Sequence, residues 1–180
     1  DASGDLAGLE CKSGRKWSEP PSPDDVGVDA VASLPEMTAI GGTKLSTGAD
    51  GEWIAEQAWY DGPLIQGTAG GAWTVGVGTA LPNQRLLPDV SAVADPMTGV
   101  RIVLNQRVVV GGGTSQAAPI WAGFAALMNQ SLIGRGSPPL GHLNPLLYKI
   151  AKTATLPGFR DISMGGNAIM PSSTTGYDMV

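Results

Sequence analysis

A serine stands at the junction between a glycine run and a long apolar segment. Residues 111–115 read Gly-Gly-Gly-Thr-Ser, and residues 116–132 are almost all apolar or small. The glycines would let a substrate backbone approach closely, and a helix N-terminus offers free N–H groups and a positive dipole end to a developing oxyanion. This pattern predicts that Ser115 is a nucleophile. The alternative is that Thr114 or Ser115 only caps the helix. A phosphate-binding loop is disfavoured, because the run lacks the lysine that reaches the terminal phosphates.

Several β-strands are expected around this serine. We predict a strand at 37–45, a strand or short helix at 53–59, and a strand within 87–94. The glycine pair at 41–42 indicates a bulge or a close backbone approach. Residues 100–104 and 107–110 read as a hairpin whose turn is Asn105-Gln106.

Two helices are expected after the serine. The first, from Gln116 to about Leu132, has no polar face and is therefore expected to be buried on all sides, with Pro119 in its first turn. The second is short and covers 146–151. Helices interleaved with strands predict a layered α/β architecture.

Composition excludes several classes of function. The 180 residues carry 11 basic and 16 acidic side chains, a net charge of −5 with no basic cluster, so a nucleic-acid partner is not expected. No apolar run approaches the roughly 18 residues of a spanning helix, so a membrane location is not expected. The single Cys11 excludes an internal disulfide and a thiolate metal cluster. The chain begins at Asp1 and ends at Val180 without a closing element, which we interpret as part of a longer domain.

The residues around Ser115 resemble the nucleophile motif of the subtilisin-like fold. Gly112-Gly113-Thr114-Ser115 is followed by Ala118-Pro119, as in that motif. Subtilisins use a histidine base that precedes the serine, whereas His142 follows it here, so we interpret His142 as a structural or surface residue. The turn that would hold the subtilisin oxyanion asparagine ends instead in Asp5.

An aspartate at that turn resembles the sedolisin (serine-carboxyl peptidase) family. Further matches follow in the family's order over nearly the whole chain: Leu9-Glu10-Cys11, Leu34-Pro35, residues 40–43, Glu56 with Trp59, residues 87–91, Asp95 with Thr98-Gly99, and Leu143-Asn144-Pro145 with Tyr148. The resemblance implies a subtilisin-like three-layer α/β fold with a mostly parallel sheet. Residues 1–180 would form the C-terminal part of one such domain.

The resemblance implies roles for two residues. Ser115 would form an acyl-enzyme, and Asp5 would donate a hydrogen bond to the oxyanion together with the Ser115 backbone N–H. A carboxylic acid donates only while it is protonated, which suits a low working pH. The other interpretation of Asp5 is an ordinary turn residue at a strand end.

The family activates its serine with a Glu that is linked to an Asp four residues later on a helix of the N-terminal half. A carboxylate can act as the base where an imidazole would already be protonated. Glu52 and Glu56 have the right spacing but belong to a different element, so we interpret them as solvated or structural. Asp24 and Asp25 are expected at the surface.

The whole protein is therefore expected to be an acid-acting endopeptidase or tripeptidyl-peptidase with peptide or protein substrates. This chain alone is expected to be inactive without its N-terminal half. The alternative is a catalytically silent, calcium-stabilised module of the same fold. Family members are typically exported or lysosomal, which implies a secreted or lysosome-like acidic location.

A calcium ion and a substrate contact are also implied by the resemblance. Asp161 and Asp178 would supply side-chain oxygens, and Ile162, Thr174 and Gly176 their carbonyls, which are the hard ligands Ca²⁺ prefers. Gly70 and Gly71 would border the substrate cleft, where an extended peptide pairs with exposed backbone. A simple hairpin turn is the alternative at 68–71.

Overall fold

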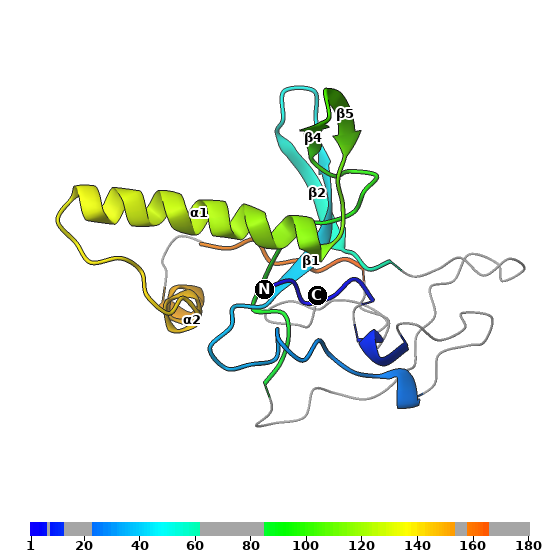
Figure 1. Ribbon diagram of the computed structural model, residues 1–180, viewed down its shortest axis with the longest axis horizontal. Coiled ribbons are helices and arrows are strands. Elements are labelled where there is room, and N and C mark those ends of the chain that lie inside the picture. The colour runs from blue at the N-terminus through cyan, green and yellow to red at the C-terminus, as the bar shows by residue number, and fades with distance from the viewer. Residues whose placement is uncertain (7, 13–22, 62–84, 154–157, 166–180) are drawn as a thin grey trace, which may run out of the picture.

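The computed structural model describes residues 1–6, 8–12, 23–61, 85–153 and 158–165 (Figure 1). Three strands form the main sheet, in the order β2 (Trp53–Ala58), β1 (Ile40–Thr47), β3 (Val90–Val93). β1 pairs antiparallel with β2 and parallel with β3, so the described sheet is mixed. Among the described residues, no helix is long and apolar enough to cross a membrane.

The first residues of the chain extend this sheet. Ala2 forms a parallel bridge with Ile40, and the Ser3 N–H donates to the Ile40 carbonyl at 2.9 Å. The carboxyl end of this short segment therefore meets the same edge as the carboxyl ends of β1 and β3. In open α/β sheets that edge is where ligands bind, so Asp5 lies at a favoured position.

The predicted glycine pair lies within β1, where it permits a close approach. A Cβ on Gly42 would stand 2.8 Å from the Ala94 Cβ and 2.8 Å from the Trp59 ring. The register shift of the sheet lies elsewhere, between Ser46 and Thr47. Close packing, rather than a bulge, explains the glycine at position 42.

The predicted hairpin is present. β4 (Arg101–Leu104) pairs antiparallel with β5 (Arg107–Val110), and the turn residues Asn105 and Gln106 have φ of 49° and 61°. Positive φ at both turn residues is the geometry of a type I′ turn. The hairpin forms a separate two-stranded sheet, and its apolar side chains are exposed, with Val103 at 75%.

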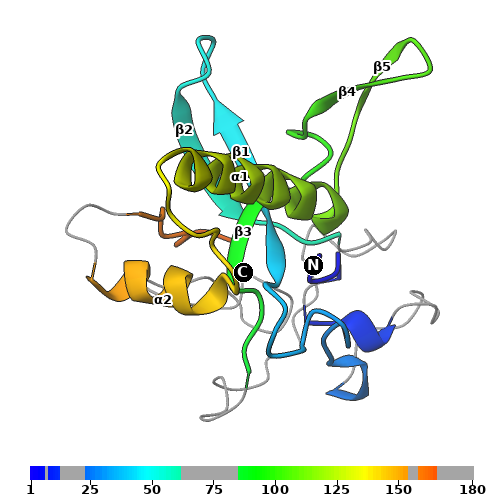
Figure 2. The ribbon, with the colours of Figure 1, turned by 60° about the vertical axis from the view of Figure 1, so that its left-hand side comes forward.

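The long helix α1 (Thr114–Gly134) lies across β1 and β3 (Figure 2). Its first turns carry Ala117 into a core with Ile40 and Ala94, and the Trp121 indole donates to the Ser91 carbonyl at 3.0 Å. α1 begins two residues before its expected start, so Pro119 lies in the second turn and not the first. Proline there has no N–H for the Ser115 carbonyl.

The expectation that this helix is buried on all sides is wrong for the chain as described. Only Thr114 and Ala117 are buried, while Phe124, Leu127 and Ile133 are 53%, 63% and 61% exposed. The reason is geometric, because α1 extends well past β1 and the described elements cover only its first turns (Figure 1). Most of its apolar surface therefore has no cover from the described residues.

The second helix, α2 (Asn144–Thr153), is longer at both ends than expected and is tied to the starts of the strands. The Tyr148 hydroxyl donates to Asp89 Oδ1 at 2.7 Å. The Arg85 guanidinium donates to both oxygens of Asp89, and the Ala39 N–H to Oδ2 at 2.8 Å. The Asp89 side chain has no exposed surface, so one carboxylate joins α2, β1 and β3.

Two 3₁₀ turns, Glu10–Lys12 and Pro23–Asp25, lie against each other near the N-terminus. Asp24 is exposed as expected, but Asp25 is only 3% exposed, because the two turns pack together.

Candidate active site

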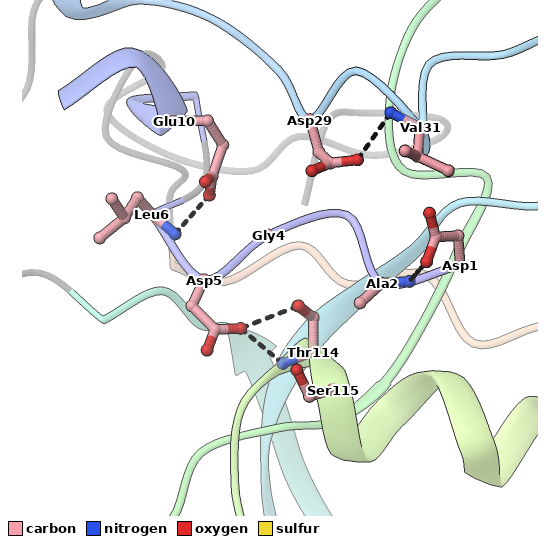
Figure 3. Close-up of a pocket in the computed structure, with 10 residues that line it drawn as sticks. All are labelled: Asp1, Ala2, Gly4, Asp5, Leu6, Glu10, Asp29, Val31, Thr114 and Ser115. Carbon is pink, nitrogen blue, oxygen red and sulfur yellow. Dashed lines mark hydrogen bonds between the residues drawn. The ribbon is translucent and has the colours of Figure 1, made fainter. Parts of the chain in front are cut away.

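Asp5 and Thr114 are 109 positions apart in the sequence, and they are joined by hydrogen bonds in the structure (Figure 3). The Thr114 N–H donates to Asp5 Oδ1 at 2.7 Å, and the Thr114 hydroxyl donates to the same oxygen at 2.8 Å. Gly4, with φ of +102°, turns the chain at the end of the first sheet segment, and the Asp61 N–H donates to the Asp5 carbonyl at 2.7 Å. The backbone of Asp5 is therefore held as well as its carboxyl group.

The turn before the helix requires glycine at position 113. Gly113 has φ of +87°, and a Cβ there would stand 2.7 Å from Asp5 Oδ2. Its N–H donates to the Ala94 carbonyl at 2.6 Å, which fixes the turn to the end of β3. Asp5 can approach the helix only because position 113 has no side chain.

Neither Thr114 nor Ser115 caps the helix, because both lie inside it. The cap position is Gly113, which supplies no side-chain acceptor. The acceptor comes from outside the helix as the Asp5 carboxyl, which sits at the positive end of the dipole. Ser115 is exposed in the first turn, where backbone N–H groups have no intrahelical acceptor. A backbone donor and a carboxyl group thus flank the serine.

An open depression of about 740 Å³ surrounds these groups (Figure 3). It is lined by Asp1, Ala2, Gly4, Asp5, Leu6, Glu10, Asp29, Val31, Thr114 and Ser115. Four of these ten residues are acidic and none is basic. The side chains that line the depression are therefore acidic or uncharged.

Glu10 shows the effect of this acidic lining. Its Oε1 accepts the Leu6 N–H at 2.7 Å, and the side chain lies over Gly4. Burial raises the pKa of Glu10 above its ordinary value, and the nearby charges of Asp5 and Asp29 raise it further, against the lowering effect of the Leu6 N–H. The sequence pattern included Glu10 only in the family match, without a place in the site. The one signal in the sequence that could have placed Glu10 in the site is its position five residues after Asp5.

His142, Glu52 and Glu56 lie where they were expected. His142 is exposed in the loop between α1 and α2. Glu52 is exposed in the β1–β2 turn, and Glu56 lies on β2, where its Oε1 accepts the Thr43 hydroxyl at 2.6 Å. Both glutamates belong to strand and turn structure rather than to a helix. Neither lines the depression in the part of the chain that the structure describes.

The expected calcium and substrate residues are only partly described. Asp161 is exposed and Ile162 half-buried, on a segment that β2 anchors through a 2.8 Å hydrogen bond from the Ala58 N–H to the Met164 carbonyl. Thr174, Gly176, Asp178, Gly70 and Gly71 lie outside the described residues. Within the described ranges, no three His, Cys, Asp or Glu side chains gather as a metal site.

Comparison with known proteins finds relatives that match most of this chain. The chain is 35% identical over 156 residues to kumamolisin of Bacillus sp. (strain MN-32), which covers 79% of this chain and 27% of the relative. It is 32% identical over 178 residues to sedolisin of Pseudomonas sp. (strain 101), covering 92% of this chain and 29% of that one. No protein-family model matches the sequence.

A solved structure of Pseudomonas sedolisin, a serine-carboxyl proteinase complexed with two molecules of pseudo-iodotyrostatin, matches the fold. The TM-score is 0.73 at 29% identity, and the match covers 99% of this chain and 50% of that chain. The chain thus spans half of this solved structure and less than a third of the length of kumamolisin and sedolisin.

Proposed function

Because the chain belongs to the sedolisin family and has its subtilisin-like α/β fold with a mixed sheet, we propose that it carries the Ser115 side of a serine-type peptidase site. The proposed reaction is hydrolysis of peptide bonds at acidic pH through an acyl-enzyme on Ser115. The observation that carries the proposal is the pair of hydrogen bonds that hold Asp5 against the start of α1, beside the exposed serine. The relatives named as serine-carboxyl proteinase and tripeptidyl-peptidase support a peptide substrate.

The geometry suits oxyanion stabilisation. Attack by Ser115 Oγ on a peptide carbonyl places negative charge on the carbonyl oxygen, which the Ser115 N–H and a protonated Asp5 would stabilise. Asp5 lies beside Asp1, Glu10 and Asp29 in the lining of the depression. Low pH supplies the proton. We therefore place the working range on the acidic side, consistent with an exported or lysosome-like acidic location.

The base that activates Ser115 would come from the N-terminal half of the same catalytic domain. A Glu linked to an Asp four residues later would fulfil this role, as the family resemblance implies. The exposed apolar faces of α1 and of the β4–β5 hairpin offer the surface on which such a half would pack. We call this chain together with its N-terminal half the completed domain.

The proposal is tested by peptide cleavage in the completed domain between about pH 3 and pH 7. We expect Ser115→Ala to abolish cleavage, and Asp5→Ala to lower kcat/KM by about 10²–10³, the usual cost of losing an oxyanion donor. Ser137→Ala, at an exposed serine just beyond the other end of α1, is the matched control and should cleave normally. Cleavage that survives Ser115→Ala, or no cleavage at any acidic pH, would favour the silent module instead.

A calcium ion near the C-terminus is the second part of the proposal. Asp161 on the anchored segment, with Ile162, Thr174, Gly176 and Asp178, would hold it through carboxylate and carbonyl oxygens, a donor set that fits Ca²⁺. Gly70 and Gly71 would contact the substrate backbone.

Calcium binding is tested by thermal unfolding of the completed domain. We expect chelation to lower Tm, since an ion at 100 times its Kd stabilises by about 2.7 kcal/mol. Asp161→Asn should remove this difference, while Asp50→Asn at an exposed turn should keep it. An equal chelator effect in both variants would contradict the assignment.

A further inference from the structure

Thr114 makes one more hydrogen bond at the site than its place at the start of the helix requires. Its side chain is only 3% exposed, although it neighbours the exposed Ser115 and lines the open depression. The Thr114 N–H is one of the free donors at the start of the helix and is satisfied by Asp5, and the hydroxyl adds a second hydrogen bond to the same acceptor. The hydroxyl therefore has a task beyond the helix.

Both Thr114 donors bind Asp5 Oδ1, at 2.7 and 2.8 Å. An oxygen that already accepts two hydrogen bonds is the less favourable place for a proton, so a proton on this carboxyl belongs on Oδ2. The two donors suit the carbonyl oxygen of the neutral acid as well as the carboxylate. The clamp therefore persists when Asp5 is protonated, and Oδ2 lies against Gly113, where a Cβ would stand only 2.7 Å away.

The charged side chains that line the depression with Asp5 are all acidic. They are Asp1, Glu10 and Asp29. The N-terminal ammonium donates to the Thr38 carbonyl at 2.7 Å. Among the described residues of the depression no basic side chain is present, and the hydrogen bonds that hold the Asp5 carboxyl come from Thr114.

We infer that Thr114 is a positioning residue that fixes the Asp5 carboxyl and leaves Oδ2 as the oxygen that carries the proton and donates it in the oxyanion hydrogen bond. This inference rests on the proposed role of Asp5. The hydroxyl of Thr114 does not touch the substrate; it acts through Asp5.

The test compares Thr114→Val, Thr114→Ser and a matched control in the completed domain. Thr43 is the control, because it is 1% exposed and its hydroxyl also donates to a carboxylate, Glu56 Oε1, at 2.6 Å. Thr114→Val should lower kcat about tenfold with KM nearly unchanged, since a misplaced group costs one to two orders of magnitude.

Thr114→Ser keeps the hydroxyl and should restore kcat. Thr43→Val should leave kcat and KM unchanged, even if it lowers Tm. An unchanged kcat in Thr114→Val, or an equal loss of kcat in Thr43→Val, would overturn the inference.

A second readout does not depend on activity. In the Ser115→Ala protein at one fixed pH, the ¹³C resonance of the Asp5 carboxyl responds to the hydrogen bonds that the carboxyl accepts, so Thr114→Val should shift this resonance and Thr43→Val should not. An unchanged resonance in Thr114→Val overturns the clamp even if the enzyme is inactive. Full cleavage by Asp5→Ala would instead overturn the oxyanion role of Asp5, so the two failures are distinguishable.

Discussion

At the scale of single residues, the site depends on side chains whose contacts with one another cannot all be predicted from the sequence. Ser115 and Asp5 were predicted from their own motifs, and the structure brings them to one depression. Thr114 was interpreted as a possible cap, because a threonine at a helix start usually serves its own helix. Its bond to a residue 109 positions away is a tertiary fact that spacing does not contain.

The ionisation of Asp89 should make the stability of the fold depend on pH. Burial alone would raise its pKa, but hydrogen bonds from Arg85, the Ala39 N–H and Tyr148 outweigh burial and lower the pKa below its ordinary 3.8. A lowered folded pKa gives stability that is present above about pH 4 and is lost as pH falls through the lower folded value. The bonded carboxylate therefore suits the acidic working range proposed above.

Replacing Asp89 should cost much of this stability. Asp89→Asn leaves the Arg85 guanidinium without its charge partner, so we expect a loss of about 3 kcal/mol in the free energy of unfolding at pH 6, with less loss below pH 3. Urea unfolding at both pH values measures it, with the exposed Asp24→Asn as control. An equal loss at both pH values would contradict the assigned ionisation.

At the scale of elements, the sequence predicted most segments and misjudged some limits. The strands, the hairpin turn and both helices exist where apolar runs and turn residues indicated. The start of α1 was placed too late, because Asp5, and not a residue next to the helix, supplies the first acceptor. The nature of the 53–59 segment was open, and pairing with β1 decides it as a strand.

The hairpin turn offers a direct test of its backbone geometry. Gln106 has φ of 61°, a conformation that costs an ordinary side chain energy and costs glycine little. We expect Gln106→Gly to raise the free energy of unfolding by about 0.5–1 kcal/mol, because Asn-Gly is the favoured type I′ pair. Gln57→Gly, in the extended strand β2, should lower it instead. Destabilisation by Gln106→Gly would show that the turn has another geometry.

At the scale of the whole molecule, the apolar surface is the clearest departure from expectation. An apolar helix was predicted to be buried, and the pattern was correct about its chemistry, yet the described residues cover only its first turns. A sequence pattern can show that a surface needs cover but not whether the same chain provides it. The N-terminal half proposed above would supply that cover.

A charge on this surface should block completion of the domain. Leu127 is 63% exposed on α1, so Leu127→Glu should leave the stability of this chain nearly unchanged. Its carboxylate would be buried without a partner in the completed domain, so we expect affinity for a separately added N-terminal half to fall at least tenfold. Gln130→Glu, also exposed on α1, serves as a control for added charge. Undiminished binding by Leu127→Glu would show that the half packs elsewhere.

The most direct measurement of the central claim is the mass of the acyl-enzyme. The completed domain would be mixed with a peptide ester at about pH 4, quenched in acid and digested, and the peptide that contains Ser115 would be weighed. We predict that this peptide gains the mass of the acyl group, and that Ser115→Ala abolishes the gain while Ser137→Ala does not. An acyl group on any other residue, or one that persists in Ser115→Ala, would contradict Ser115 as the nucleophile.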